Sequence, residues 1–329
     1  MNHENYVLKA VPEDFIVEEL KDLKNIEKGD YSYYILRKKD IGTAETIGKI
    51  SRKLHIDKKY INFAGNKDKK AVTSQHISIS KGPENDFEEE KWSLKFIGKF
   101  KERINLGDLQ GNHFEITIRN IEVVPEIKNR FINYFDEQRF SKNNSEIGKL
   151  IVKKDFKNAC ELIENENIEN FLSEKPNEYA NALKAEKKLV KIYIHAYQSY
   201  LWNKYVSEYV KKYGRNIQSL DCSLGKLYFG DVESKKIPLI GFGTELDDEM
   251  EILLKEEGIS QRDFLIRSIP ELSSEGAERD LVVEAENVKI GKLIDDDLNK
   301  GKKKIVISFD LPKGSYATMF IRSLFTDKS

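Results

Sequence analysis

The chain changes character twice along its length, and this change constrains the fold more than any other feature of the sequence. Strand-like segments occur early, for example at 96–100 and 114–118. Residues from about 144 to 213 are rich in Glu, Lys, Asn and Ala and show little strand character. Strand-like segments return at 280–285 and 304–309. A helix-rich middle between strand-rich ends predicts one domain that is interrupted by an inserted second domain.

Helical spacing of apolar residues predicts the main helices. The first is expected over 43–54, where Thr43 is a favourable capping residue. Pro125 suits the first turn of a helix, so a second helix is expected from Pro125 to about Phe135. Tyrosines recur at helical spacing over 193–206, and this stripe is interpreted as core rather than as a surface that stacks RNA bases. Further helices are expected at 248–257 and 316–325.

Composition limits the class of protein. At 329 residues the chain is long enough for two domains, and its net charge is only −1 although 34% of its residues are charged. A nucleic-acid partner would therefore require the basic groups to cluster on one face, because local potential rather than net charge attracts a polyanion. Cys160 and Cys222 lie far apart and the five histidines are scattered, so no metal site is expected. Two isolated cysteines also fit a reducing compartment, so a cytoplasmic location is expected. No secretory leader is recognised at the N-terminus and no apolar run is long enough for a membrane span, so a soluble protein is expected.

One short stretch, residues 65–75, concentrates charge around a single carboxylate. Asp68 has lysines at positions 67, 69 and 70, and apolar or alternating segments lie on either side, so Asp68 is expected on a loop between strands. Composition alone favours a solvated turn. The alternative is a nucleophilic or general-base aspartate that neighbouring cations keep ionised. The same lysines could neutralise phosphates of a polyanionic substrate.

Six blocks of sequence resemble, in order, the motifs of the TruD family of tRNA pseudouridine synthases. The central block, NKDKKAVTSQ at 66–75, resembles the family pattern G-x-K-D-x-x-A-x-T-x-Q. The other five are KAVPEDFIVEE at 9–19, GDLQGNHF at 107–114, NYFDEQRFS at 133–141, AYQSYLWN at 196–203 and LPKGSYAT at 311–318. The blocks span nearly the whole chain.

The resemblance implies an α/β (α+β) fold. It predicts a pseudouridine synthase catalytic domain with a mixed, mainly antiparallel sheet, formed by 1–155 together with 276–329. A helix-rich TRUD-specific domain is expected to be inserted at 156–275. The reaction that the resemblance implies is the isomerisation of a uridine in tRNA to pseudouridine, usually at position thirteen in the D arm. This reaction involves no net redox change, so neither a metal nor a small-molecule cofactor is expected.

The resemblance also assigns roles to residues. Asp68 is the expected catalytic group. Because the target base must leave the stack, Phe15 and Phe135 are expected to contact the flipped uridine and Asn133 to hydrogen-bond it. Core packing is the ordinary alternative for a phenylalanine. The remaining substrate-binding candidates are Tyr316, which would close the pocket, and Lys9, Lys67 and Arg139, which would pair with phosphates or position Asp68.

Three positions depart from the family pattern. Asp136 and Ser141 stand where the family usually has glycine, so the local geometry differs if either glycine is needed for a positive φ. Ser323 follows Arg322 where relatives often have an acid. The rival interpretation is a non-catalytic RNA-binding or RNA-folding protein on the same scaffold, although such a protein would not need an acid beside phosphates. Nothing in the sequence requires more than a monomer.

Overall fold

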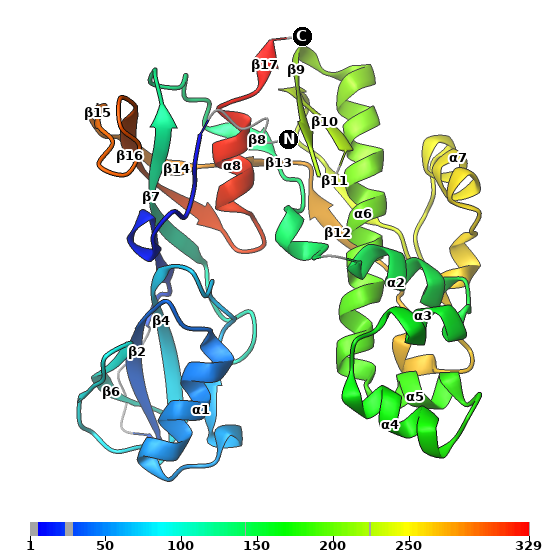
Figure 1. The fold of residues 1–329 in the computed structure, drawn as a ribbon, viewed down its shortest axis with the longest axis horizontal. Helices are drawn as coiled ribbons and strands as arrows, with labels where there is room; N and C mark the ends of the chain where they lie inside the picture. The colour runs from blue at the N-terminus through cyan, green and yellow to red at the C-terminus, as the bar shows by residue number, and fades with distance from the viewer. Residues whose placement is uncertain (1–5, 24–28, 142, 224, 329) are drawn as a thin grey trace. The chain divides into compact units, whose positions relative to one another are not determined.

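The computed structural model describes residues 6–23, 29–141, 143–223 and 225–328 (Figure 1). The chain forms two compact units, each made of separate stretches. The first unit comprises residues 1–129 and 284–317, and the second comprises residues 130–283 and 318–329. The division into a catalytic domain and an insertion at 156–275 has other boundaries and stays a prediction.

The first unit is formed by a sheet with few helices. Its elements are η1 Pro12–Asp14, β1 Phe15–Leu20, β2 Tyr31–Lys39, α1 Thr43–Leu54, η2 Lys58–Tyr60, β3 Ile61–Phe63, β4 Val72–Ser80, β5 Phe87–Glu88, β6 Trp92–Phe100, β7 Gly111–Ile121, β14 Glu286–Ile290, β15 Ile294–Asp295 and β16 Lys303–Pro312. The ten strands of this unit form one sheet in the order β14-β16-β7-β1-β4-β2-β6-β5, with β15 paired to β16 and β3 paired to β4. Of these pairings β1 with β4 is parallel and the others are antiparallel, which confirms a mixed, mainly antiparallel sheet.

Alternating burial explains why these segments are strands. In β16, Ile305, Ile307 and Phe309 are fully buried, while the residues between them are partly exposed. Helix α1 places Ile47 and Ile50 in a core with residues of β2, β4 and β6. The predicted helix at 43–54 is confirmed, but Gly42 rather than Thr43 is its N-cap residue. The Thr43 hydroxyl instead accepts a hydrogen bond from the backbone of the Asp68 loop.

The second unit is mainly helical. Its elements are β8 Arg130–Ile132, η3 Glu137–Arg139, α2 Asn144–Val152, α3 Phe156–Leu162, α4 Glu166–Glu174, α5 Tyr179–Ala185, α6 Lys187–Tyr213, β9 Arg215–Cys222, β10 Gly225–Asp231, β11 Lys236–Leu239, α7 Asp248–Glu257, η4 Gln261–Phe264, η5 Pro270–Leu272, β12 Ala277–Asp280, β13 Val282–Glu284, α8 Ala317–Ser323 and β17 Asp327–Lys328. The long helix α6 passes through this unit (Figure 1) and buries Tyr197 and Tyr205, which confirms the tyrosine stripe as core. The helix expected at 248–257 is confirmed by α7.

The prediction of a helix from Pro125 to about Phe135 is wrong. Residues 124–128 have no regular structure, and Arg130–Ile132 forms strand β8, which pairs with β13. Beyond the strand, the Asn133 N–H donates to the Leu281 carbonyl at 2.9 Å. Pairing with a strand about 150 residues away therefore overrides the local helix propensity. The preference of proline for the first turn of a helix contains no information about that distant partner. Among the described helices, none is long and apolar enough to cross a membrane.

Candidate active site

Four of the six motif blocks meet on adjacent strands of the ten-stranded sheet. Strand β1, from the first block, lies between β4 of the Asp68 block and β7 of the GDLQGNHF block. Val17 is in register with Thr73, and Glu19 with Asn112. On the far side of β7, Asn112 is in register with Leu311 of the C-terminal block. Segments that are far apart in the sequence are thus brought to one place in the first unit.

Asp68 lies on the loop between β3 and β4, as the sequence predicts. Its carboxylate oxygen Oδ2 accepts a hydrogen bond from Lys9 Nζ at 2.9 Å, and both side chains are 23% exposed. The Lys9 ammonium also lies 3.9 Å from the centre of the Phe15 ring. Lys9 therefore contacts two other predicted site residues, the acid Asp68 and the aromatic ring of Phe15.

Lys67, the neighbour of Asp68, is held by the sheet. Its ammonium lies 3.2 Å from the Glu19 carboxylate and donates to Asn112 Oδ1 at 2.5 Å, and its side chain is only 7% exposed. Glu19 is fully buried and also accepts a hydrogen bond from the His76 backbone. Burial would raise the pKa of Glu19, but hydrogen bonds from His76 and the charge of Lys67 outweigh it and lower the pKa. Glu19 is therefore ionised, and its carboxylate holds Lys67 of the Asp68 loop against the sheet.

The other two blocks meet in the second unit, around Phe135. Phe135 is 7% exposed, with the Arg279 guanidinium 3.9 Å from the centre of its ring. The Phe135 and Trp202 rings form a T-shaped pair with their centres 5.7 Å apart. The backbone N–H of Phe135 donates to Asn203 Oδ1 at 2.9 Å, and the Phe135 carbonyl accepts from Asn203 Nδ2 at 2.8 Å. Asn203, the last residue of the AYQSYLWN block, therefore fixes the backbone of Phe135.

Asn133 and Arg139 lie in the same cluster as Phe135. Arg279 Nη2 donates to the Asn133 side-chain oxygen at 2.7 Å, and the Asn133 amide nitrogen donates to the Asp280 carbonyl. The Arg139 guanidinium lies 5.8 Å from the Phe135 ring centre. Arg279 belongs to no motif block, and the sequence analysis missed it because its partners lie about 146 residues away.

The departures from the family pattern have distinct structural outcomes. Ser141 adopts a φ of 45°, the left-handed region that favours glycine. Asp136 has an ordinary extended φ of −84°, and its carboxylate forms an ion pair with Arg322 at 3.2 Å and accepts from the Thr318 hydroxyl at 2.7 Å. Ser141 therefore bears backbone strain, whereas Asp136 supplies an acid to Arg322, the arginine followed by Ser323.

The structure assigns the predicted site residues to two groups. Lys9, Phe15, Lys67 and Asp68 belong to the first unit, as does Tyr316, which is half-buried immediately before α8. Asn133, Phe135 and Arg139 belong to the second unit. Within the first group, Lys9 contacts both Asp68 and Phe15. Within the second group, the Arg139 guanidinium lies near the Phe135 ring. In the part of the chain that the structure describes, no group of three or more His, Cys, Asp or Glu side chains is arranged to hold a metal ion.

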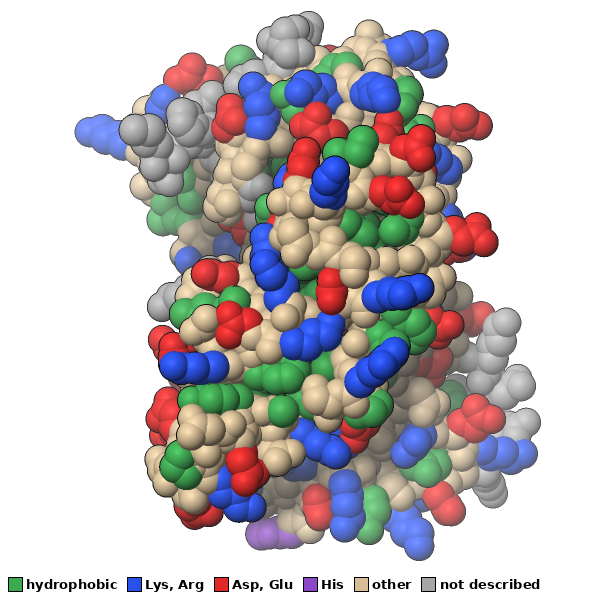
Figure 2. All heavy atoms as spheres, turned by 90° about the vertical axis from the view of Figure 1, so that its right-hand side faces the viewer, with side chains coloured by type: hydrophobic (Ala, Val, Ile, Leu, Met, Phe, Trp, Pro, Cys, Tyr) green, Lys and Arg blue, Asp and Glu red, His purple; other side chains and the backbone are tan. Residues whose placement is uncertain are grey.

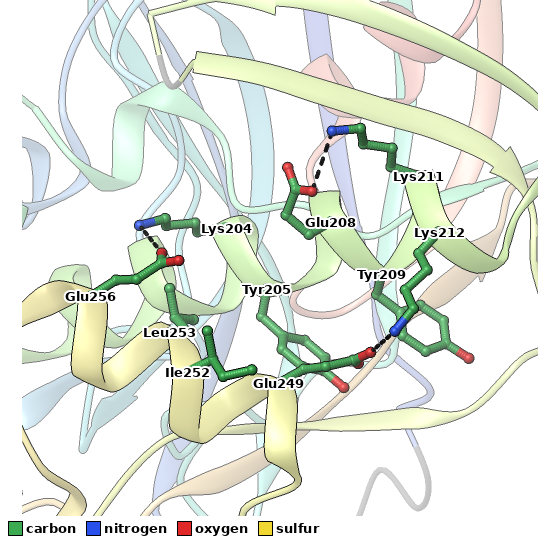
Figure 3. Close-up of a pocket in the computed structure, with 10 residues that line it drawn as sticks. All are labelled: Lys204, Tyr205, Glu208, Tyr209, Lys211, Lys212, Glu249, Ile252, Leu253 and Glu256. Atoms are coloured by element: carbon green, nitrogen blue, oxygen red, sulfur yellow. Dashed lines mark hydrogen bonds and ion pairs between the residues drawn. The ribbon is translucent and has the colours of Figure 1, made fainter.

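A cavity of about 490 Å³ lies between α6 and α7 of the second unit and has no predicted site residue in its lining (Figure 3). Three lysines in its lining each pair with a glutamate, in the pairs Lys204–Glu256, Lys211–Glu208 and Lys212–Glu249. The face drawn in Figure 2 likewise shows basic and acidic side chains interspersed over the described surface. The cavity is therefore balanced in charge and has no general attraction for a polyanion.

The first unit is thus a ten-stranded mixed, mainly antiparallel sheet with Asp68 on the loop that precedes its inner strand β4. More particularly, the family model for tRNA pseudouridine synthase D (TruD) matches residues 4–170, 162–221 and 233–324, so the chain belongs to this family.

Individual relatives agree with this assignment. The chain is 34% identical to a probable tRNA pseudouridine synthase D 2 of Methanocaldococcus jannaschii, over 97% of this chain and 91% of the relative. It is 29% identical to tRNA pseudouridine synthase D of Aquifex aeolicus, over 97% of each chain. The crystal structure of a putative tRNA pseudouridine synthase D from Methanosarcina mazei matches with a TM-score of 0.71 and 28% identity, over 96% of this chain and 92% of that one.

Proposed function

We propose that this chain is an isomerase that converts a uridine in tRNA to pseudouridine, with Asp68 as the essential catalytic group. Membership of the TruD family supports the reaction and the substrate class. The observation that carries the role of Asp68 is its 2.9 Å ion pair with Lys9, which lies against the Phe15 ring. This ion pair joins residues 59 positions apart in the sequence, so the fold itself holds the Asp68 carboxylate against the Lys9 ammonium.

The proposed chemistry needs one carboxylate. The bond between uracil N1 and ribose C1′ breaks, the base turns, and a bond forms between C5 and C1′; the C5 proton leaves and N1 gains a proton. Asp68 can begin this sequence as a nucleophile towards carbon or as a base towards the ribose 2′ proton. In either case the carboxylate must be ionised and fixed in position. Lys9 meets the second requirement by hydrogen-bonding one of its oxygens.

Four of the predicted residues are proposed to recognise the substrate base. Phe15, Phe135, Asn133 and Tyr316 would contact the extruded uridine, as the family resemblance implies. The Arg279 guanidinium stacked on Phe135 would keep that ring in place, since cation–π contacts are stabilising.

The backbone of the RNA is proposed to contact basic side chains around the Asp68 loop. Lys69 and Lys70 are exposed and suit phosphate binding. Lys9 in the first unit and Arg139 in the second are further candidates for pairing with phosphates, as the family resemblance implies. Lys67 is proposed to position Asp68 rather than to pair with a phosphate, because its ion pair with Glu19 directs its ammonium towards the sheet. The target is proposed to be position thirteen in the D arm, and the enzyme to act as a cytoplasmic monomer.

The direct test is to incubate the protein with unmodified tRNA transcripts and to map pseudouridine along each transcript. The expected product is pseudouridine at a single D-arm position, with no uracil released. Release of free uracil would identify a base-excising glycosylase instead. Tight tRNA binding without either product would favour the non-catalytic RNA-binding or RNA-folding protein.

A further inference from the structure

We propose that Lys38 is a positioning residue for the catalytic carboxylate, because its buried ammonium holds the backbone of the loop that carries Asp68. This inference rests on the proposed role of Asp68. It concerns a residue outside the six motif blocks, on strand β2, where Lys38 is in register with Thr73 of β4 and with Trp92 of β6.

The ammonium of Lys38 is directed at main-chain oxygens. Nζ donates to the Asp68 carbonyl at 2.7 Å and to the Ile41 carbonyl at 2.9 Å, and it lies 3.4 Å from the Lys67 carbonyl. A lysine has three N–H donors, so these three carbonyls match its full capacity. Two of them belong to Lys67 and Asp68, so the contact is made with the catalytic residue itself.

Burial of the Lys38 ammonium costs desolvation free energy, and this cost suggests that the lysine has a functional role. Lys38 is 1% exposed, and an ammonium removed from water is strongly destabilised unless it is hydrogen-bonded. Burial also lowers the pKa of Lys38 to about 8, an effect that the nearby Asp68 charge opposes and the Lys67 charge reinforces. An apolar side chain at this point of the sheet would avoid the penalty, but it would leave the loop carbonyls without a donor.

Neighbouring side chains complete the frame around the loop. The Thr43 hydroxyl of α1 accepts from the Lys67 N–H at 2.9 Å. Gln75 of β4 donates to the Gly65 carbonyl at 3.0 Å, and its side-chain oxygen accepts from Thr43 at 3.3 Å. The loop is therefore held from β2, α1 and β4, and Lys38 is the member of this frame that contacts the Asp68 backbone.

The consequence is that Lys38 sets where the Asp68 side chain points. A displacement of about 1 Å at a catalytic group can lower the rate by about 100-fold. Lys38→Met retains the length and apolar stem of the side chain but removes its donors. We expect this variant to lower kcat by about 10- to 100-fold at saturating tRNA. The Kd for tRNA is expected to stay within about two-fold, since a residue this deeply buried does not reach RNA.

The matched control is Lys39→Met. Lys39 follows Lys38 on the same strand, is exposed and pairs with Glu13 at the surface, so this variant should change kcat by less than about two-fold. Lys38→Arg, which retains charge and donors, should recover part of the activity lost in Lys38→Met. If the methionine variant does not fold, Lys38→Leu, which likewise has no donor, takes its place under the same criterion.

The outcomes separate this inference from the proposed function. A native kcat in folded Lys38→Met, alongside an inactive Asp68→Asn variant, would overturn the positioning role and leave the role of Asp68 intact. An active Asp68→Asn variant would overturn both. Loss of tRNA affinity in Lys38→Met at unchanged kcat would also contradict the inference, because it would assign the lysine to binding. A selective loss of kcat with partial recovery by arginine supports it.

Discussion

Replacing Arg119 by methionine tests how the segment that carries Lys9 and Phe15 is held to the sheet. Arg119 lies on β7 and is 4% exposed. Its guanidinium donates to both carboxylate oxygens of Asp14 at 2.9 Å and to Asp296 at 2.8 Å. Asp14 in turn accepts from the Val11 N–H at 3.1 Å, which ties the N-terminal segment to this cluster.

The expected effect follows from burial. In Arg119→Met, the two buried carboxylates of Asp14 and Asp296 lose their cation, and breaking a buried pair in this way costs about 3–5 kcal/mol. The first unit contains Trp92 and the second contains Trp202, the two tryptophans of the chain. Urea unfolding followed through Trp92 in a Trp202→Phe background should therefore show a midpoint lower by about 1–3 M.

The same cluster predicts how stability depends on pH. Burial would raise the pKa of Asp296, but hydrogen bonds from Asn299, from the backbones of Leu298 and Asn120, and from Arg119 lower it to about 2. A depressed carboxylate pKa contributes stability that is complete above the unfolded value of 3.8 and is lost as the pH falls through about 2. The first unit should lose stability between these values, and less steeply in Arg119→Met.

Arg37→Met is the control for this prediction. Arg37 is exposed on β2 of the same sheet, and its replacement should alter the free energy of unfolding by less than about 0.5 kcal/mol. If Arg119→Met lowered the free energy by no more than this control, the buried cluster would not stabilise the first unit, and the reasoning would be refuted.

Three further predictions concern the second unit and the RNA. Phe135→Ala should lower kcat/KM by the equivalent of one stacking contact, about 1–3 kcal/mol, whereas an unchanged rate would assign the ring to the core alone. Asn203→Ala removes two hydrogen bonds to the Phe135 backbone and should destabilise the second unit by about 2–4 kcal/mol in urea unfolding followed through Trp202; a loss below 1 kcal/mol would contradict the contact. Lys69→Gln combined with Lys70→Gln should reduce the slope of log affinity for tRNA against log salt by about 1–2, and an unaltered slope would mean that these lysines face away from RNA.

Much of the fold is predictable from the sequence where periodicity and burial agree. The alternation in β16 and the apolar spacing in α1 both identify the buried face, and α7 matches its expected bounds of 248–257. The segment after Pro125 shows the limit of such reasoning. Its conformation is set by pairing with β13, and local preference contains no information about that partner.

The candidate site divides in the same way. Asp68 could be found because it is the only acid in a lysine-rich loop, and its neighbours because they belong to recognisable blocks. Lys38 and Arg279 could not, since each acts through contacts with residues about 30 and 146 positions away. Lys67 illustrates a third case. The sequence shows three similar lysines around Asp68, and only the fold shows that Lys67 pairs with Glu19.

The central claim is that the Asp68 carboxylate performs the chemistry, and single-turnover pseudouridine formation by Asp68→Asn tests it most directly. Asparagine has nearly the same shape but cannot act as a nucleophile or base in this step. The account predicts a rate lower by at least about 1,000-fold, with the Kd for tRNA changed by no more than a few-fold. Turnover near the native rate in the asparagine variant would contradict it.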